Sequence, residues 1–271
     1  MNSQSLKIVL ITGASSGIGK AIGTYLQEKG YQVYGTSRNP SKSTDLPFPL
    51  IALDVTRDET IEAAVAEVVR REGRLDILIN NAGVGITGPI EETPDEEILK
   101  AFETNYFGPI KMIKAVLPVM RKNKAGLIIN ITSIAGYMGL PFRGIYSASK
   151  GALELTTEAF RMELKGSGIR MTNVAPGDFA TNIAAGRYHA PVLEDSPYRH
   201  TYGSTLELMN GHVDQGDDPI LMAKAIHKII ETPEPRVHYK VGQPLQRLST
   251  ALKNLLPDKW FEKMLAKHYK L

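Results

Sequence analysis

The sequence predicts a single α/β domain over residues 1–271, built on a doubly wound parallel sheet of seven strands with helices on both faces. Short apolar runs alternate with longer amphipathic segments, and short links join them. A glycine-rich turn connects the first strand-like run to the first helical segment. The 271 residues suffice to bury one large core, and no repeat or linker divides them. A helical extension is expected after the last strand.

The seven strand-like runs are short, rich in apolar residues and bounded by turn residues. They span residues 7–12, 32–36, 50–53, 75–79, 126–131, 169–174 and 236–241. The fourth run is apolar enough to be buried on both faces, as strands of covered parallel sheets are. The segments between the runs then serve as right-handed crossover connections.

Helical segments with clear start and stop signals lie between these runs. They are expected at residues 18–29, 57–72, 93–121 and 146–165. Three of them are followed by glycine, at Gly30, Gly73 and Gly166. In the third, Thr93 is expected as the N-cap, with Pro94 at the first position and Glu96 as the capping-box partner. Pro109 and Pro118 should each bend or interrupt it.

Composition and charge exclude several classes of function. The chain has no cysteine, which excludes disulfides, thiolate metal sites and cysteine nucleophiles, and we expect no metal site. Residues 244–271 carry six Lys or Arg against two acidic residues, a balance of +4, so the rest of the chain is near neutral at −1. No broad nucleic-acid surface is expected. Without a signal peptide or an apolar run of ~18 residues, we expect a cytoplasmic protein.

The turn at residues 12–19 is typical of a phosphate-binding loop between a strand and a helix. Gly13 permits a tight turn, Gly17 lets backbone N–H groups approach a pyrophosphate, and Gly19 allows close packing of the helix. The helix N-terminus adds partial positive charge. The alternative is a plain βα turn, which would not need three glycines. The turn therefore predicts a bound dinucleotide.

The end of the second strand indicates which dinucleotide. An acidic residue there would bind a ribose 2′-hydroxyl and favour NAD(H). The chain instead has Thr36, Ser37 and Arg38, and the guanidinium of Arg38 can hold a 2′-phosphate. We therefore expect NADP(H) to be preferred, with NAD(H) possible. The alternative is that Arg38 is simply a solvated surface residue.

Tyr146 and Lys150 form the pair with the clearest chemical meaning. Four residues apart on a helix, they share one face. A lysine cation stabilises a phenolate, so a phenol with an ordinary pKa near 10 can exchange a proton near neutral pH. Ser133 stands thirteen residues upstream, at the end of a strand-like run. The Tyr–Lys spacing alone also arises by chance on amphipathic helices.

Taken together, these features resemble the short-chain dehydrogenase/reductase family over residues 6–241. The matching motifs are Thr12 to Gly19, Asp54–Val55, Asn80 to Gly83, Asn105, Ser133, Tyr146 with Lys150, and Pro176–Gly177. The resemblance implies a Rossmann-type fold and a dehydrogenase or reductase. Segments 83–89 and 136–142 are similar to the branch with estradiol-type hydroxysteroid dehydrogenases and certain retinol dehydrogenases.

The resemblance also implies a role for each matching residue. Tyr146 is the general acid or base, Lys150 binds the nicotinamide ribose and tunes Tyr146, Ser133 holds the substrate oxygen, and Asn105 holds a relay water. Asp54 binds the adenine amine. The full set of implied cofactor contacts is Gly13, Ser15, Ser16, Gly17, Ile18, Gly19, Ser37, Arg38, Asp54, Val55, Asn81, Ala82, Gly83, Tyr146, Lys150, Pro176, Gly177, Phe179 and Thr181.

Each of these residues also has a purely structural interpretation. Asp54 can cap a helix, Asn81 can serve a turn, and Ser133 can bond the backbone at a strand end. All of these interpretations would have to hold at once for the site to be absent.

Residues 182–216 form a long connection, which is typical of a substrate lid. Apolar and aromatic residues there and before Tyr146 indicate a lipophilic pocket, or else pack on the body. The substrate-lining residues that we expect are Met138, Leu140, Phe142, Ile183 and Tyr188. The expected substrate is a ketone, an aldehyde or a secondary alcohol, bulky and steroid- or retinoid-like.

The segment 244–271 has apolar residues at helical spacing with basic residues between them. It can cover the substrate cleft, contact a second subunit or lie on a membrane surface. We favour packing on the body or on a partner subunit over peripheral membrane contact, and we expect a homodimer.

Three other functions remain open. One is a nucleotide-sugar epimerase or dehydratase, although such relatives have another glycine spacing and a larger C-terminal domain. The second is a non-catalytic NADP(H)-sensing regulator, although this chain keeps the whole catalytic set. The third is a dehydrogenase that prefers NAD(H).

Overall fold

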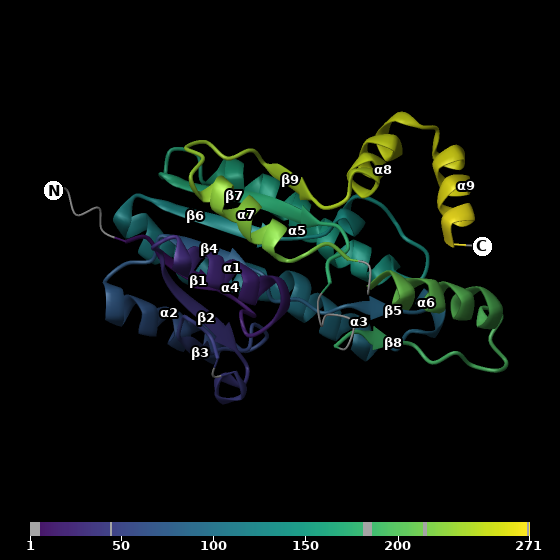
Figure 1. Ribbon diagram of the computed structural model, residues 1–271, viewed down its shortest axis with the longest axis horizontal. Coiled ribbons are helices and arrows are strands. Elements are labelled where there is room, and N and C mark those ends of the chain that lie inside the picture. The colour runs from purple at the N-terminus through teal and green to yellow at the C-terminus, as the bar shows by residue number, and fades with distance from the viewer. Residues whose placement is uncertain (1–5, 44, 181–185, 214–215, 270) are drawn as a thin grey trace.

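The computed structural model describes residues 6–43, 45–180, 186–213, 216–269 and 271. At its centre is a seven-stranded parallel sheet in the order β3-β2-β1-β4-β6-β7-β9 (Figure 1). Its strands are β1 (Ile8–Ile11), β2 (Gln32–Ser37), β3 (Leu50–Ala52), β4 (Ile77–Asn80), β6 (Gly126–Ile131), β7 (Ile169–Pro176) and β9 (His238–Val241). The predicted doubly wound sheet is confirmed. The strand order reverses between β1 and β4, and ligands of such sheets bind beyond the carboxyl ends of the strands at this point.

Helices cover both faces of this sheet (Figure 1). The helices that pack on it are α1 (Gly17–Glu28) and α7 (Ile220–Ile230) on one face, and α2 (Asp58–Glu72), α4 (Gly108–Asn123) and α5 (Gly144–Glu163) on the other. The alternation of side chains along each strand produces the two cores. In β1, Val9 and Ile11 pack toward α1 and α7, whereas Ile8 and Leu10 pack toward α2 and α4. All four side chains are buried, as the near-continuous apolar run predicts.

The predicted helix over residues 93–121 is wrong in its start, whereas the predicted interruption at Pro109 is confirmed. The hydroxyl of Thr93 donates to the carbonyl of Pro89 at 2.7 Å, so Thr93 does not cap a helix, and α3 (Asp95–Phe102) begins after Pro94. A π-helical turn, η3 (Glu103–Phe107), then joins α3 to α4. Pro109 has no N–H to donate to the carbonyl four residues earlier, which explains the interruption there. Pro118 is accommodated inside α4.

Two short strands not predicted from the sequence lie beside the sheet. They are β5 (Ile86–Thr87) and β8 (Tyr188–His189), and they pair in parallel. The rest of the described part of segment 182–216 includes α6 (Arg199–Val213). In Figure 1 this unit lies beyond the carboxyl ends of the main strands, on the side of the switch point.

The C-terminal extension is a pair of helices, α8 (Pro244–Leu255) and α9 (Asp258–Tyr269). Figure 1 shows this pair, in yellow, projecting from the body, with α9 on the same side as α6. The hydroxyl of Thr205 on α6 donates to the carbonyl of Tyr269 at 3.2 Å. Phe261 of α9 is buried in a small cluster with Met138 and Ala175, so the extension packs on the body near the end of β7.

Candidate active site

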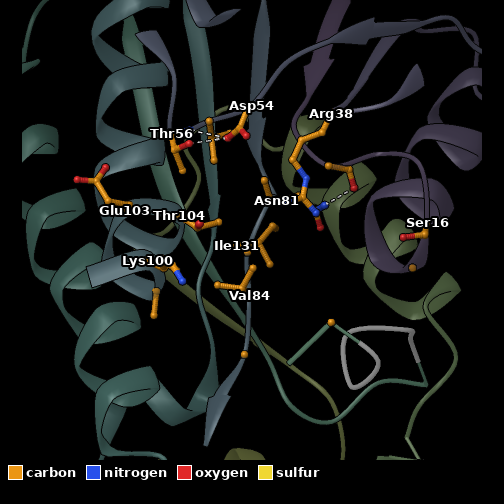
Figure 2. Close-up of a pocket in the computed structure, with 18 of the residues that line it drawn as sticks. Ser16, Arg38, Asp54, Thr56, Asn81, Val84, Lys100, Glu103, Thr104 and Ile131 are labelled. Atoms are coloured by element: carbon orange, nitrogen blue, oxygen red, sulfur yellow. Dashed lines mark hydrogen bonds between the residues drawn. The ribbon is translucent and has the colours of Figure 1, made fainter. Parts of the chain in front are cut away.

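A cleft of about 930 Å³ lies at the carboxyl ends of the strands, around the switch point (Figure 2). It gathers most of the predicted cofactor residues, namely Gly13, Ser15, Ser16, Gly17, Ile18, Ser37, Arg38, Asp54, Val55, Asn81, Ala82, Gly83, Tyr146, Lys150 and Pro176. Gly177 and Phe179 line a smaller adjoining cavity instead. Gly19 lies behind the turn, and Thr181 lies outside the described residues.

The glycine turn has the geometry that a bound pyrophosphate requires. Gly13 and Gly17 adopt φ angles of 65° and 54°, in the left-handed region that favours glycine. A Cβ on Gly19 would lie 2.4 Å from the carbonyl oxygen of Gly13 and 2.5 Å from Nδ2 of Asn81. That amide donates to the carbonyls of Thr12 at 2.9 Å and Gly13 at 3.0 Å. Asn81 therefore clamps the turn to β4, and the residues present fit a dinucleotide.

The far end of the cleft carries two cationic side chains. Arg38 follows β2, and Lys42 comes from the short helix η1 (Pro40–Lys42); both line the cleft. The sequence interpretation missed Lys42, although a lysine close after the second strand is a detectable signal. Asp54 lies across the cleft (Figure 2). Its Oδ1 accepts from the N–H of Thr56 at 3.0 Å and from its hydroxyl at 2.8 Å, so Asp54 also stabilises the turn before α2.

Tyr146 and Ser133 meet at the smaller cavity, which has a volume of about 130 Å³. Tyr146 lines both this cavity and the large cleft, and therefore lies where the two join. The Oγ of Ser133 accepts from the N–H of Ala135 at 3.1 Å, which leaves its own proton outside that bond. The predicted pair thus borders one small space from two elements, the end of β6 and the start of α5.

Lys150 is buried directly behind this junction. Its Nζ donates to the carbonyl of Ile131 at 3.0 Å. A Cβ on Gly83 would lie 3.3 Å from this Nζ and 3.2 Å from Oδ1 of Asn105, so a side chain at position 83 would crowd both groups. Burial lowers the pKa of Lys150, while Tyr146 and Glu154 act in the opposite direction. Burial is the larger of these opposing effects, and the two neighbouring groups offset part of it.

Asn105 is fully buried in the π-helical turn η3. Its Oδ1 accepts from the N–H of Val84 at 2.8 Å, and its Nδ2 donates to the carbonyl of Val84 at 2.9 Å and to Oγ of Ser149 at 3.2 Å. These bonds tie the chain after β4 to α5. The predicted water relay remains a prediction, since the amide is already engaged on both of its polar atoms.

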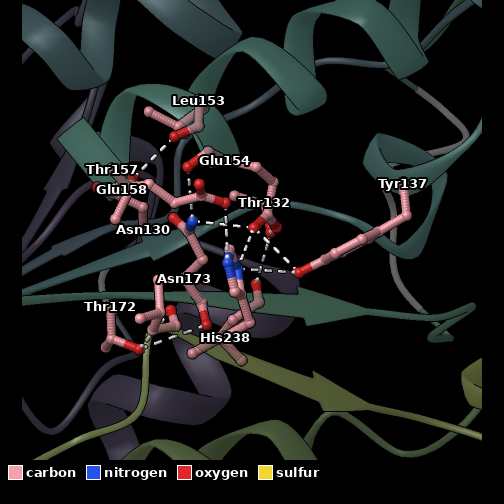
Figure 3. A network of polar contacts seen from close by, with 12 residues as sticks. Asn130, Thr132, Tyr137, Leu153, Glu154, Thr157, Glu158, Thr172, Asn173 and His238 are labelled. Carbon is pink, nitrogen blue, oxygen red and sulfur yellow. Dashed lines mark hydrogen bonds and ion pairs between the residues drawn. The ribbon is translucent and has the colours of Figure 1, made fainter. Parts of the chain in front are cut away.

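A buried polar network joins α5 to β7 and β9 (Figure 3). Its centre is the buried carboxylate of Glu154, one helical turn after Lys150. This carboxylate accepts a short hydrogen bond from Thr132, a bond from Tyr137 at 3.0 Å and one from Asn173 at 2.9 Å. His238 Nδ1 lies 2.7 Å from the same carboxylate. We did not predict this network, although a glutamate on the inner face of an amphipathic helix is a usable signal.

The predicted substrate residues are distributed over three places. Tyr188 lines the large cleft, and Phe142 packs against the rings of Tyr198 and Tyr202, with centroids 6.3 Å and 5.2 Å apart. Met138 and Leu140 pack in the cluster beneath α8 and α9, and neither borders the two cavities described above. Ile183 lies outside the described residues.

The smaller cavity is more polar than a purely lipophilic pocket. Arg143 places its guanidinium 5.2 Å from the ring centroid of Tyr146. Arg187 also lines this cavity and packs directly on Gly85. A Cβ on Gly85 would lie only 2.8 Å from Cγ of Arg187. Burial lowers the pKa of Arg187, and its Nη1 is buried without a hydrogen-bond partner among the described residues. His268 and Tyr269 of the C-terminal extension complete the wall.

Comparison with known proteins agrees with this geometry. The family model for short chain dehydrogenases matches residues 7–191. The chain belongs to the short-chain dehydrogenase/reductase family. It is accordingly an NAD(P)-binding oxidoreductase that acts on CH–OH donors. Within the parts of the chain that the structure describes, no group of three or more His, Cys, Asp or Glu side chains could hold a metal ion.

Individual relatives match over nearly the whole chain. A 3-ketodihydrosphingosine reductase of Bacteroides thetaiotaomicron is 40% identical over 264 residues, covering 97% of this chain and 98% of that protein. The crystal structure of a short-chain dehydrogenase from Streptomyces avermitilis superposes with a TM-score of 0.82 at 35% identity, covering 93% of this chain and 94% of the other. A short-chain dehydrogenase of Burkholderia cenocepacia in complex with NADP has a TM-score of 0.74 at 25% identity, with 98% coverage of both chains.

Proposed function

We propose that this chain is an NADP(H)-dependent oxidoreductase that interconverts a bulky, lipophilic ketone or aldehyde with the corresponding alcohol. The observation that carries the proposal is the position of Tyr146. It lines both the dinucleotide cleft and the smaller cavity that also contains Ser133, with Lys150 buried behind it. A proton donor at such a junction can act on a substrate oxygen while the cofactor acts on the adjacent carbon.

The roles of the four candidate catalytic residues follow from their places. NADP(H), when bound, supplies or accepts the hydride. Ser133 holds the substrate oxygen with its free hydroxyl proton, and Tyr146 delivers a proton to that oxygen during reduction or removes it during oxidation. Lys150, buried behind Tyr146, stabilises the phenolate form of Tyr146 when its amine carries a proton. Asn105, rigidly held by Val84 and Ser149, shapes the wall behind Lys150 where a relay water would lie.

The preference for NADP(H) rests on the charges at the far end of the cleft. Arg38 and Lys42 both line it, and β2 ends at Ser37 without a carboxylate. A charge-assisted hydrogen bond to a 2′-phosphate contributes about 1.5–3 kcal/mol, or about 10- to 100-fold in affinity. The relative from Burkholderia cenocepacia, which was crystallised with NADP, adds support by analogy.

The proposed substrate class rests on the relative and on the lining of the cavity. The name of the Bacteroides thetaiotaomicron protein makes a long-chain 3-keto base the first compound to test. Ile86, Phe179 and Met209 give the smaller cavity an apolar part that suits such a chain. We further propose that residues 182–216 serve as a substrate lid on a one-domain protein, which works as a homodimer in the cytoplasm.

Binding of the two cofactors tests the NADP(H) preference. We expect NADPH to bind the purified protein at least tenfold more tightly than NADH, as measured by calorimetry or fluorescence. Arg38→Ser and Lys42→Ser should each weaken NADPH binding and leave NADH binding unchanged, whereas Arg121→Ser, at an exposed site of α4, serves as the matched control. Equal affinities of the wild-type protein for both cofactors would overturn the preference.

Turnover separates an enzyme from a cofactor-sensing regulator. A panel of ketones and aldehydes with NADPH, including a long-chain 3-keto base, steroids and retinoids, should contain substrates that are reduced with measurable kcat/KM. Tight NADPH binding without reduction of any member of the panel would favour the regulatory alternative.

A further inference from the structure

The C-terminal helices leave large apolar side chains facing solvent. Leu245, Leu248 and Leu255 on α8 are 73%, 51% and 78% exposed, and Trp260 on α9 is 69% exposed. These four residues lie within sixteen positions of one segment, and large contiguous patches of exposed apolar residues mark interaction sites. Figure 1 shows that α8 and α9 project from the body, and the exposed fractions place these side chains on the solvent side of the two helices.

Helix α9 has two chemically different faces. Phe261 and Tyr269, eight residues apart, are buried against the body, and Tyr269 borders the smaller cavity. At 100° per residue, Trp260, Lys263 and Lys267 lie together on the opposite side of the helix. The inner face of α9 is therefore occupied by the protein body, and its outer face presents one exposed indole beside two lysines. Tryptophan is enriched at membrane–water interfaces, where its ring lies at the level of the headgroups.

The charge of this segment points to an anionic partner. Residues 244–271 contain six Lys or Arg but only two acidic residues, Asp258 and Glu262. Asp258 is paired with Lys253 at 2.8 Å, so Glu262 is the one acidic residue left in the segment for its five other basic residues. In a symmetric dimer formed through this face, two identical segments would meet, each with an excess of +4 charges. Their mutual repulsion disfavours self-association through this face.

We propose that the tail surface, made of Leu245, Leu248, Leu255, Trp260, Lys263 and Lys267, docks on an anionic lipid bilayer. The leucines and the tryptophan enter the interfacial layer, and the lysines contact anionic headgroups. The contact is peripheral, because no helix in the described ranges is both long and apolar enough to cross a bilayer.

The docked orientation has a consequence for substrate access. Because Tyr269 on the inner face of α9 borders the smaller cavity, the bilayer surface lies one helix away from the site of reaction. A lipophilic substrate then passes from the membrane into the cavity beside α9. This step rests on the proposed function, whereas docking itself does not.

Vesicle binding of the purified full-length protein tests the proposal. We expect the protein to float with vesicles that contain phosphatidylglycerol, but not with pure phosphatidylcholine vesicles, and added salt should weaken the binding. Lys263→Gln with Lys267→Gln should lower the partition coefficient about thirtyfold, since each lysine contributes about fivefold. Leu255→Ser with Trp260→Ser should reduce binding to the level seen with neutral vesicles.

A matched control keeps the test specific. Leu221→Ser with Lys228→Gln changes one apolar and one basic residue at exposed sites of α7, and should bind vesicles as the wild type does. Wild-type protein that stays free of anionic vesicles, or tail variants that bind as tightly as the wild type, would overturn the proposal. So would tail variants that change only the oligomeric state measured by light scattering.

The outcome is separable from the proposed function. Reduction of a short, water-soluble ketone should be equal in the wild type and in the tail variants, and circular dichroism should confirm their folding. Absence of all ketone reduction in the wild type would count against the proposed function, while flotation with anionic vesicles would still support docking.

Discussion

The buried carboxylate of Glu154 offers a quantitative test of how the site is supported. In Glu154→Leu, the hydrogen bonds from Thr132, Tyr137 and Asn173 to the carboxylate disappear, and so does the contact with Nδ1 of His238 at 2.7 Å. Each of the three donors has a poorer substitute nearby: the carbonyl of Val174 at 3.3 Å, His238 Nδ1 at 3.2 Å and the main-chain carbonyl of residue 154 at 3.2 Å, respectively. Exchanging a charge-assisted bond for a longer neutral one costs about 1 kcal/mol.

The three exchanges together should therefore lower the free energy of unfolding by about 3 kcal/mol. For a chain of this size that corresponds to a fall in Tm of roughly 6–12 °C. Urea denaturation and differential scanning calorimetry measure both quantities. Glu158→Leu is the matched control on the same helix, since Glu158 is half exposed and contacts His238 Nε2 at 3.0 Å, so its loss should cost less than about 1 kcal/mol.

The same substitution should also act on Lys150. Glu154 raises the pKa of Lys150 against the opposing effect of burial, so its removal should lower that pKa further. Glu154→Gln, which keeps an acceptor oxygen but loses the charge, should show this effect with a smaller loss of stability. Equal stability of Glu154→Leu and Glu158→Leu would refute the view that the network in Figure 3 holds the site together.

Two further substitutions test the glycine turn at the cofactor cleft and the two-stranded sheet of β5 and β8. Gly19→Ala should weaken NADPH binding tenfold or more, because its Cβ would lie 2.4 Å from the carbonyl of Gly13, whereas Gly203→Ala on α6 meets only Val192 at 3.9 Å and should bind NADPH normally. Calorimetric titration decides this, and unchanged affinity in Gly19→Ala would contradict the account of the turn. Burial, with a smaller effect of Arg187, lowers the pKa of His189. The unfolded chain then binds a proton more readily, so stability is fully present above about pH 6.5 and declines as the pH falls below it. His189→Asn should flatten this decline between about pH 7 and 5 in denaturant titrations, and His200→Asn should not; equal slopes in both variants would show that His189 is not responsible.

The sequence was sufficient for those parts of the fold that depend on local pattern. The short runs between turn residues predicted all seven strands of the main sheet. The clearest were β1, β4 and β6, which are buried throughout and nearly continuous in apolar residues. Gly13, Gly17 and Gly73 were predicted from the backbone that each turn requires, and each adopts a positive φ. Most residues of the cleft were predicted because they belong to short sequence motifs, and the chemistry of each motif indicates where its residues must lie.

The features that were missed depend on contacts between distant parts of the chain. The strands β5 and β8 have two residues each, too few for a periodic signal. The partner of Glu154 in the network, His238, lies 84 positions away. The sequence around Thr93 is typical of a helix cap, but in the structure the Thr93 hydroxyl donates to the carbonyl of Pro89 instead. The polar character of the smaller cavity was missed for the same reason, since Arg187 lies against Gly85 only in the folded chain.

In the proposed reaction, Tyr146 delivers the proton that accompanies hydride transfer from NADPH to a carbonyl carbon. The most direct measurement is single-turnover reduction of a responsive ketone by NADPH, compared between the wild type and Tyr146→Phe. We expect Tyr146→Phe to bind NADPH with the wild-type affinity and to reduce the ketone about 100-fold more slowly or worse. Reduction by Tyr146→Phe at the wild-type rate would contradict this role of Tyr146.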